Sequence, residues 1–346
     1  MRVLVATADV PFVHGGHRVI ASCLVRALRE HGAEAETLFT PQNRFGRQFA
    51  AYAATRLTDV GLSGDGRPVD QIITLRFPSY ALRHERHVCW LLHRMREYYD
   101  LWPEWRARLS WKGAIKENIR RRVIHAADSY LLRRVTKLFA LSETVQQRLR
   151  TWSNLQSEIL YPPPPHREYR CEAFDNFIFA PSRLTPLKRQ DLLIEAMARV
   201  KDRGIAAVIA GEGESAASLA ALIRDRGLDS RCRIVGHLAD SELIDYYARC
   251  RAVFFAPRME DYGFVTPEAF ASGKPVISCT DSGGAVELIE HRVNGFVLPP
   301  EPEPIADVID ELAGDRALAE RLGSAGYLRA TSLSWQNVVE KLLLQK

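Results

Sequence analysis

Short apolar runs alternate with helix-patterned segments along nearly all of this 346-residue chain. Such an alternation is typical of parallel sheets flanked by helices, because each apolar run forms a buried strand and each helix packs on the sheet. Hydrophobic residues make up 47% of the chain and charged residues 26%, which excludes wholesale disorder, collagen and low-complexity architectures. The sequence therefore predicts an α/β protein of about two domains.

The first half predicts one domain, 1–165. Apolar residues at helical spacing over 19–28, followed by Gly32, predict its first helix. Four prolines at 162–165 continue neither a strand nor a helix, so we interpret them as a linker. The strand candidates of this half are 3–6, 72–77, 87–92, 137–141 and 158–160.

After the linker the alternation restarts, and six strands in regular alternation predict a doubly wound domain over 166–330. The strand candidates are 177–180, 207–210, 233–235, 253–256, 275–278 and 296–298. The helix candidates are 189–200, 216–226, 241–249, 265–271 and 284–290, with a helical tail over 305–344.

Charge is unevenly distributed between the two halves. Residues 1–165 hold 25 Lys and Arg against 15 Asp and Glu, whereas 166–346 hold 22 against 27. This asymmetry predicts that the first half meets an anionic partner, with a membrane surface and a nucleic acid as the two candidates.

The cysteines and the apolar stretches indicate the compartment. No cysteine pair or Cys/His cluster has metal-ligand spacing, so we interpret all six as core residues of a reducing compartment. No signal-peptide pattern opens the chain, and no apolar stretch approaches the roughly 18 residues that span a bilayer. We expect a cytoplasmic protein that can rest on the inner face of the cytoplasmic membrane. The cysteines are Cys23, Cys89, Cys171, Cys232, Cys250 and Cys279.

A glycine turn follows the first strand, with Val13, His14, Gly15 and Gly16 before the first helix. Paired glycines let backbone N–H groups approach a ligand, and a helix start adds partial positive charge. An anionic or hydroxyl-rich ligand fits such a turn. The alternative is a tight strand-to-helix connection, since the third glycine of the dinucleotide fingerprint is absent.

Two cations, Arg183 and Lys188, follow the strand candidate 177–180. Open α/β sheets bind ligands in the crevice beyond the carboxyl ends of their strands. An arginine there can grip phosphate oxygens in a bidentate manner, and a lysine adds a point charge. The alternative is a solvated loop with two surface cations.

The strongest pattern is a pair of glutamates, Glu260 and Glu268, around a predicted helix start. Strand 253–256 ends, a loop with Gly263 follows, and a helix opens near Phe264 with unpaired N–H groups that suit an anion. Glu268 can accept two hydrogen bonds from a vicinal diol such as a ribose, while Glu260 faces whatever lies beyond the phosphates. Complementing the helix dipole is the alternative role for Glu260.

These motifs together resemble the nucleotide-sugar-binding domain of GT-B glycosyltransferases, specifically the large retaining family numbered four. That family carries two glutamates separated by seven residues and an Arg-Leu-x-x-x-Lys segment. The resemblance covers about 177–340 and departs at Arg189, where glycine is frequent, and at Glu214, where proline is frequent. Further matches are Gly211-Glu-Gly213, Val235-Gly236, 273–277 and 294–296, and weaker ones in the first half are Gly15-Gly16, 90–93, 142–144 and 161–163.

The resemblance implies a GT-B fold: two Rossmann-like doubly wound domains face each other across a cleft, and a final helix, 331–346, packs back on the first domain. It implies a hexosyltransferase that moves a sugar from a nucleoside-diphosphate-sugar donor, with retention, to a saccharide or lipid-linked acceptor. The pathway implied is the synthesis of cell-envelope polysaccharide or glycolipid. Base, sugar, acceptor and oligomeric state stay open.

The resemblance also implies residue roles. Arg183 and Lys188 would hold the donor diphosphate, Glu268 the ribose and Glu260 the transferred sugar, while His93 would line the sugar site across the cleft or serve as a core histidine. Arg183, Lys188, Glu260 and His93 form the implied catalytic set. The other donor-binding positions are Gly15, Gly16, Gly211, Val235, Gly236, Gly263, Phe264, Val265 and Thr266.

We expect no cofactor and no metal. The chain contains no Asp-x-Asp, the pair that the other common glycosyltransferase fold uses to hold a divalent ion. Arg183, Lys188 and the helix start can neutralise the diphosphate instead.

The segment 102–134 is basic and carries tryptophans. On a helix, Ile115, Ile119 and Val123 would stack on one side with cations around them, a pattern that suits an anionic lipid surface. The alternative is a helix with that face packed on its domain.

Two other functions stay open on the sequence alone. One is a GT-B relative that hydrolyses or epimerises nucleotide sugars. The other is a nucleic-acid-binding protein that uses the basic first half, although no nucleic-acid-reading module matches. We therefore expect no nucleic-acid partner.

Overall fold

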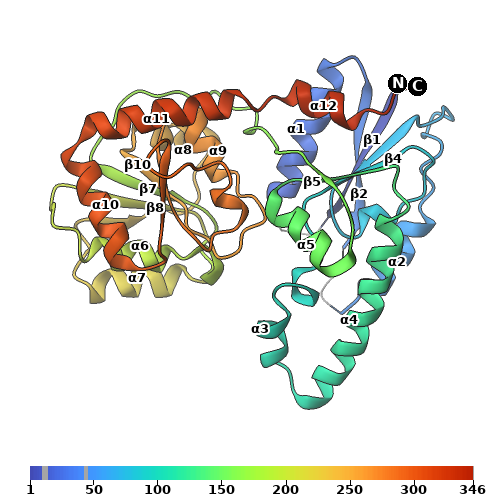
Figure 1. The fold of residues 1–346 in the computed structure, drawn as a ribbon, viewed down its shortest axis with the longest axis horizontal. Helices are drawn as coiled ribbons and strands as arrows, with labels where there is room; N and C mark the ends of the chain where they lie inside the picture. The colour runs from blue at the N-terminus through green and yellow to red at the C-terminus, as the bar shows by residue number, and fades with distance from the viewer. Residues whose placement is uncertain (10–14, 43–45, 346) are drawn as a thin grey trace. The chain divides into compact units, whose positions relative to one another are not determined.

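The computed structural model describes residues 1–9, 15–42 and 46–345. These residues form two compact units, Met1–Pro162 together with Ser334–Lys346, and Pro163–Leu333. Each unit holds one parallel six-stranded sheet flanked by helices (Figure 1). The prediction of an α/β fold with two doubly wound sheets is therefore confirmed. No helix within the described ranges is both long enough and apolar enough to cross a bilayer.

The first unit has strand order β2-β1-β3-β4-β5-β6. Val3 of β1 lies opposite Ala35 of β2 and Gln71 of β3, so the chain reverses its direction of growth across the sheet between β1 and β3. The elements are β1 (Arg2–Asp9), α1 (Gly16–Glu30), β2 (Glu34–Pro41), α2 (Gln48–Leu57), β3 (Gln71–Thr74), η1 (Ser79–Ala81), β4 (His87–Leu91), η2 (Arg96–Tyr98), α3 (Trp102–Ala107), α4 (Trp111–Leu132), β5 (Lys137–Ala140), α5 (Glu143–Ser153) and β6 (Glu158–Ile159).

Several of these elements are absent from the sequence prediction, and β2 and α2 show why. β2 lies at the sheet edge, and its glutamates Glu34 and Glu36 point to solvent while Ala35 is buried, so no continuous apolar run marks it. α2 buries Gln48 and Thr55 along with its apolar residues, which weakens its helical pattern.

The last helix, α12 (Trp335–Leu342), belongs to the first unit. Trp335 meets the fully buried Trp90 edge to face, with ring centroids 6.3 Å apart. The buried side chain of Gln71 donates to Leu342 O at 2.7 Å and accepts from Leu344 N at 2.9 Å. The chain end therefore completes the core that the first 162 residues begin.

The second unit has strand order β12-β11-β10-β7-β8-β9. Its elements are β7 (Phe177–Pro181), η3 (Pro186–Lys188), α6 (Gln190–Met197), β8 (Ala206–Ala210), α7 (Ala216–Asp225), β9 (Cys232–Ile234), α8 (Asp240–Arg249), β10 (Ala252–Phe254), α9 (Val265–Ala271), β11 (Val276–Cys279), η4 (Gly284–Val286), β12 (Gly295–Leu298), α10 (Pro302–Gly314) and α11 (Arg316–Thr331).

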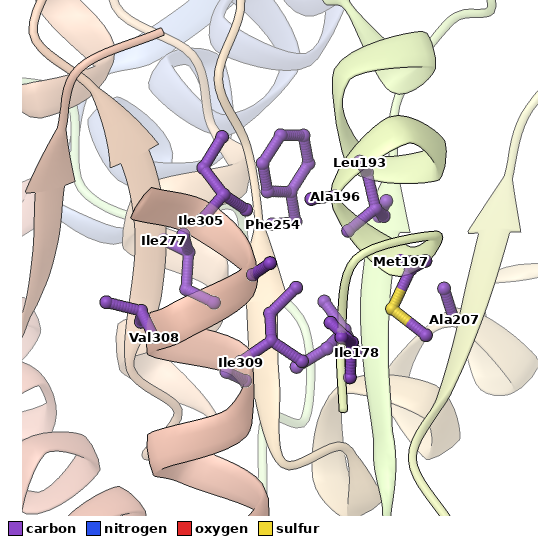
Figure 2. Packing of buried hydrophobic residues seen from close by; sticks show 14 of the residues in the cluster. Ile178, Leu193, Ala196, Met197, Ala207, Phe254, Ile277, Ile305, Val308 and Ile309 are labelled. Atoms are coloured by element: carbon purple, nitrogen blue, oxygen red, sulfur yellow. The ribbon is translucent and has the colours of Figure 1, made fainter. Parts of the chain in front are cut away.

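The core of the second unit lies between the sheet and helices α6 and α10. Figure 2 shows Ile305 and Ile309 of α10 close to Ile277 and Ile178 of the sheet, with Met197 of α6 beside them. All five are fully buried, and each contributes roughly 1.5–3 kcal/mol by leaving water. This core holds the strands whose carboxyl ends carry the candidate site.

Two sequence predictions need correction here. The expected helix over 284–290 is a single 3-10 turn, Gly284–Val286. A Cβ on Gly283 or Gly284 would clash with the backbone of the loop around Glu260, so this turn packs directly against that loop. The helical tail predicted over 305–344 is confirmed and consists of α10, α11 and α12. Cys171 is exposed while the other five cysteines are buried, so the expectation of six core cysteines is wrong for Cys171.

Candidate active site

The second sheet changes its direction of growth between β7 and β10. From β7 the chain adds β8 and β9 on one side, and then β10, β11 and β12 on the other. Ligands of open α/β sheets bind beyond the carboxyl ends of the strands at such a switch point. The loops after β7 and β10 are the ones that carry Arg183, Lys188 and Glu260.

The loop after β7 is shaped by two glycines of the next loop. Gly211 and Gly213 have φ of 131° and 156°, and a Cβ on either would clash with the carbonyl oxygens of Ser182 and Leu184. These glycines therefore let the loop after β8 pack directly against the backbone of the loop after β7. Arg183 is exposed and forms no ion pair within the described part of the chain.

Lys188 and Glu260 meet where the loops after β7 and β10 converge. Lys188 Nζ donates to Glu260 Oε2 at 2.6 Å, and both side chains are largely buried. Lys188 Nζ also lies 5.3 Å from the centroid of the Phe255 ring. Arg258 N donates to Leu187 O at 2.8 Å, which joins the two loops through their backbones as well.

Arg189 fixes the same loops, a role that the sequence analysis did not assign. Its backbone is left-handed, with φ of 53°, which explains why glycine is frequent at this position in the resembled family. Its guanidinium donates to Ala256 O at 2.7 Å and makes two bonds to Asp281, at 2.8 and 2.7 Å. Arg189 thus ties the end of β10 to the loop that lies beside Glu260.

The start of α9 offers free backbone donors. The amides of Gly263, Phe264 and Val265 donate no hydrogen bond within the described ranges, as is usual for a helix start. Gly263 has φ of 82°, and a Cβ there would clash with the ring of Phe255. Thr266 is turned inward, because its Oγ1 donates to Ala285 O at 2.9 Å.

Glu268 is buried in a network of protein donors. Its Oε2 accepts from Tyr247 OH at 2.9 Å, and its Oε1 accepts from Tyr169 OH at 3.4 Å and from Arg167 Nη1. Burial raises the pKa of the Glu268 carboxyl, and Arg167 opposes that shift. The sequence analysis did not identify Arg167, which lies 101 positions earlier in the chain.

Val235 and Gly236 follow β9 beside the glycine loop. Val235 N donates to Ile209 O at 2.9 Å, and Gly236 O accepts from Gly211 N at 2.7 Å. Gly236 has φ of 73° with open space where a Cβ would stand. A left-handed backbone, rather than close packing, therefore favours glycine there.

In the first unit, Gly15 and Gly16 open α1 after β1, while Val13 and His14 lie outside the described residues. His93 follows β4 and is half-buried, and its Nδ1 lies 2.8 Å from Arg94 O. The pKa of buried His17 is lowered to about 4, by burial first and then by Arg76 and His93. Arg76 follows β3, so the switch point of this sheet gathers polar groups as well.

Helix α4 presents one stripe of apolar residues to solvent. Trp111, Ile115, Ile119 and Val123 are 70%, 56%, 61% and 47% exposed. The residues that α4 buries are Glu117, Ile124, Asp128 and Leu132. The apolar stripe is therefore not the face that packs on the domain, and α3 and α4 extend from one end of the unit (Figure 1).

Side chains with metal-binding chemistry do not gather in the described ranges: no group of three or more His, Cys, Asp or Glu there could hold an ion.

Comparisons with known proteins address the second unit most directly. The family model described as glycosyl transferases group 1 matches residues 167–329. A GDP-mannose-dependent alpha-(1-6)-phosphatidylinositol monomannoside mannosyltransferase of Mycobacterium tuberculosis is 34% identical over 172 residues, which cover 46% of this chain and 44% of that protein. A D-inositol 3-phosphate glycosyltransferase of Kribbella flavida is 31% identical over 173 residues, 46% of this chain and 41% of that one. The chain matches less than half of the length of these relatives.

Solved structures resemble the whole chain. Sucrose-phosphate synthase from Thermosynechococcus elongatus has a TM-score of 0.78 at 14% identity, over 98% of this chain and 96% of that one. HepE from Anabaena, solved with UDP and glucose, has a TM-score of 0.71 at 19% identity over 99% and 98%. WaaG, a glycosyltransferase involved in lipopolysaccharide biosynthesis, has a TM-score of 0.71 at 14% identity over 99% and 98%. Residues 167–329 thus belong to the glycosyl transferases group 1 family, and the whole chain has the GT-B fold.

Proposed function

We propose that this protein is a hexosyltransferase that moves a sugar from a nucleoside-diphosphate-sugar donor to a carbohydrate or lipid-linked saccharide acceptor, with retention. The observation that carries the proposal is the Lys188–Glu260 contact at the switch point of the second sheet, beside the free amides that open α9. It places a cation, a carboxylate and backbone donors at one position. A diphosphate with an attached sugar needs this combination of groups.

The cations act on the leaving group. As the bond between sugar and diphosphate breaks, negative charge builds on the diphosphate oxygens, and Arg183 and Lys188 stabilise that charge. Glu260 exchanges its contact with Lys188 for the hydroxyls of the sugar. Glu268 accepts hydrogen bonds from the ribose of the donor.

We further propose that the reaction needs no divalent metal, because the two cations and the α9 amides supply the neutralisation that a metal would otherwise provide. The expected result is full transfer activity in excess chelator. Activity that is lost in chelator and restored only by Mg²⁺ or Mn²⁺ would contradict this proposal.

Two names among the comparisons bear on the donor. One relative is named for its dependence on GDP-mannose, and one similar structure was solved with UDP and glucose. Both support a hexose carried on a nucleoside diphosphate, with uridine and guanosine as the bases to test first. Roles in cell-envelope polysaccharide or glycolipid synthesis follow as the proposed setting.

The test is a thermal-shift panel of nucleoside diphosphates and their sugars, followed by a product assay with and without acceptor. We expect stabilisation by one base class and loss of that shift in Lys188→Ala. Lys201→Ala is the matched control, because Lys201 is an exposed lysine of the same unit that lies outside the loops of the site. Release of free sugar at the same rate without acceptor would favour a nucleotide-sugar hydrolase instead.

We also propose that α4 holds the first unit on an anionic membrane at the cytoplasmic face, where a lipid-linked acceptor is available. The apolar stripe of Trp111, Ile115, Ile119 and Val123 is exposed, and the exposed cations Lys112, Lys116 and Arg122 lie on the same helix. Such a face suits the boundary between headgroups and acyl chains. Arg120 and Arg121 are less suited to lipid, since Arg120 pairs with Glu117 and Arg121 lies over Trp102 and Trp152.

Vesicle sedimentation tests this surface. With anionic vesicles, charge reversal of Lys112, Lys116 and Arg122 and the separate change Ile119→Ser should each reduce the bound fraction. Charge reversal of Arg321 and Arg329, two exposed arginines of α11, is the matched control and should leave binding unchanged. Equal binding by all variants would contradict the proposal.

A further inference from the structure

We infer that Arg167 is a positioning residue: it keeps the buried carboxylate of Glu268 charged and aimed, so that the carboxylate can accept hydrogen bonds from the ribose of a nucleotide donor. The inference rests on the proposed function, which gives Glu268 that ligand. It adds a residue that lies before the second sheet begins, in the segment that leads from the prolines to β7.

Three segments meet at the Glu268 carboxylate. Glu268 lies in the first turn of α9, Tyr247 comes from α8, and Arg167 and Tyr169 come from the segment before β7. Arg167 Nη1 donates to Glu268 Oε1, and Arg167 Nη2 donates to Asp240 Oδ1 at 3.0 Å. Asp240 is 75% exposed, so it holds the guanidinium from the solvent side.

Arg167 is the one cation among the described groups that face this carboxylate. Tyr247 and Asp240 approach from α8, and Tyr169 and Arg167 from the segment before β7. The Glu268 side chain is 9% exposed, and burial favours its protonated form. The positive charge of Arg167 opposes that tendency, and neither tyrosine supplies a compensating charge.

The charged form is the one that a ribose requires. An ionised carboxylate offers about four lone-pair sites and no donor, whereas a protonated one loses acceptor capacity to its own hydrogen. Tyr247, Arg167 and Tyr169 occupy three sites, which leaves one on Oε2. The Tyr169 bond is long, at 3.4 Å, and Tyr169 is half-buried, so the second hydroxyl of a vicinal diol can replace it.

The same geometry allows a competing outcome in which Arg167 simply occupies the position of the ribose and must leave. The two roles predict opposite changes in nucleotide affinity when Arg167 is removed. If Arg167 supports Glu268, its removal weakens nucleotide binding and makes that binding more sensitive to acid. If Arg167 blocks Glu268, its removal strengthens binding at every pH.

The experiment measures the affinity of the full chain for UDP and GDP, and for their 2′-deoxy counterparts, by calorimetry between about pH 5.5 and 8.5. The variants are Arg167→Met, Arg167→Lys and the control Arg170→Met. Arg170 belongs to the same segment, and its guanidinium pairs with Glu172 and Asp245 rather than with Glu268. Thermal melts of each variant report whether the second unit is folded.

In both proteins the affinity should fall roughly tenfold per pH unit once the pH is low enough to protonate the Glu268 carboxyl. In Arg167→Met this fall should begin at a higher pH than in the wild type. The preference for the ribose over the deoxyribose nucleotide, roughly tenfold or more in the wild type, should shrink toward one. Arg167→Lys should restore most of the pH profile because it keeps the charge. Arg170→Met should match the wild type.

Unchanged or tighter binding by Arg167→Met across the pH range would overturn the inference. Glu268→Gln separates this failure from failure of the proposed function. If Glu268→Gln weakens nucleotide binding and Arg167→Met does not, only the role of Arg167 is wrong. If Glu268→Gln binds every nucleotide as the wild type does, the assignment of Glu268 and the role of Arg167 are both wrong.

Discussion

Glu260 and Glu268 stand eight positions apart, yet the two carboxylates have different surroundings. Glu260 lies on the loop before α9, its side chain is 22% exposed, and Lys188 is its cation. Glu268 lies inside the helix, its side chain is 9% exposed, and three donors from two other segments surround it. Glu260 can therefore change its partner, whereas Glu268 is held in place before a ligand binds.

The difference teaches where each glutamate can act. A carboxylate that is still partly exposed and has Lys188 as its single cationic partner can change partners when a sugar arrives, at little cost. A buried carboxylate with several donors holds its position before any ligand binds, and its loss disturbs the protein itself. This difference agrees with the proposed roles, in which Glu260 binds the sugar that is transferred and Glu268 binds the ribose of the donor.

The largest expected effect is on stability, and it separates the two positions. Glu268→Ala leaves Arg167 without its buried counterion and the buried Tyr247 hydroxyl without an acceptor, so the free energy of unfolding should fall by about 3 kcal/mol. Glu260→Ala should cost less than about 1 kcal/mol. Urea unfolding followed by far-UV circular dichroism measures both.

The tryptophans supply an internal control for that measurement. All six, Trp90, Trp102, Trp105, Trp111, Trp152 and Trp335, lie in the first unit. Tryptophan fluorescence therefore follows the unfolding of that unit, and Glu268→Ala should leave its midpoint nearly unchanged. An equal loss of stability in Glu260→Ala would remove the contrast between the two carboxylates.

The second prediction concerns transfer rate. Lys188→Ala should lower kcat about a hundredfold, because the proposed function places this charge at the leaving group. Glu260→Ala should also lower kcat, and the double variant should fall short of the product of the two effects, since the side chains touch at 2.6 Å. Steady-state kinetics on the three variants and on Lys201→Ala give the coupling. Strictly multiplicative losses would mean that the Lys188–Glu260 contact does not matter for transfer.

The third prediction isolates the backbone of Arg189, which ties the loop of Glu260 in place. A left-handed residue with a Cβ costs about 1 kcal/mol relative to glycine. Both Arg189→Gly and Arg189→Ala lose the bonds to Asp281, so Arg189→Gly should be the more stable variant by about 1 kcal/mol. Paired urea titrations test this, and equal stability would show that the φ of 53° carries no strain.

Features that depend on a short stretch of sequence could be predicted, whereas contacts between distant positions could not. The bounds of α9, 265–271, and the loops with Arg183, Lys188 and Glu260 could be read from the sequence, because strand ends and a helix start mark them. The contact of Arg167 with Glu268 could not, since it joins positions 101 apart and no pattern near Arg167 points to a partner. The edge strand β2 escaped prediction because Glu34 and Glu36 interrupt its apolar run.

Helix α4 shows the same limit of prediction from sequence. Its sequence fixes a helix with Ile115, Ile119 and Val123 on one side, but a helical pattern does not say which face meets the domain. The packed face mixes Ile124 and Leu132 with polar groups: Asp128 is fully buried and accepts from the hydroxyls of Tyr52, Tyr80 and Tyr99. These tyrosines come from distant positions, so only the folded chain shows that the apolar stripe is left exposed.

The smallest predicted effect is a pH dependence at Glu268. Burial raises the pKa of this carboxyl above its ordinary value of 4.5. The folded protein therefore binds the proton more readily than the unfolded chain does. The stability that this group contributes is present below pH 4.5 and is lost as the pH rises through the folded-state pKa. Glu268→Gln has no titrating group there, so the free energy of unfolding of the wild type minus that of the variant should grow as the pH falls.

Urea titrations of wild type and Glu268→Gln between about pH 7 and pH 5 measure that difference, with Glu260→Gln as the matched substitution on the neighbouring loop. A difference that grows toward acid means that burial outweighs Arg167 in setting the protonation of Glu268. A difference that shrinks toward acid reverses this order: Arg167 and the two tyrosines would then hold the pKa below 4.5. In that case the carboxylate would be charged at every pH at which the enzyme works, and removing Arg167 would have its largest effect on nucleotide binding.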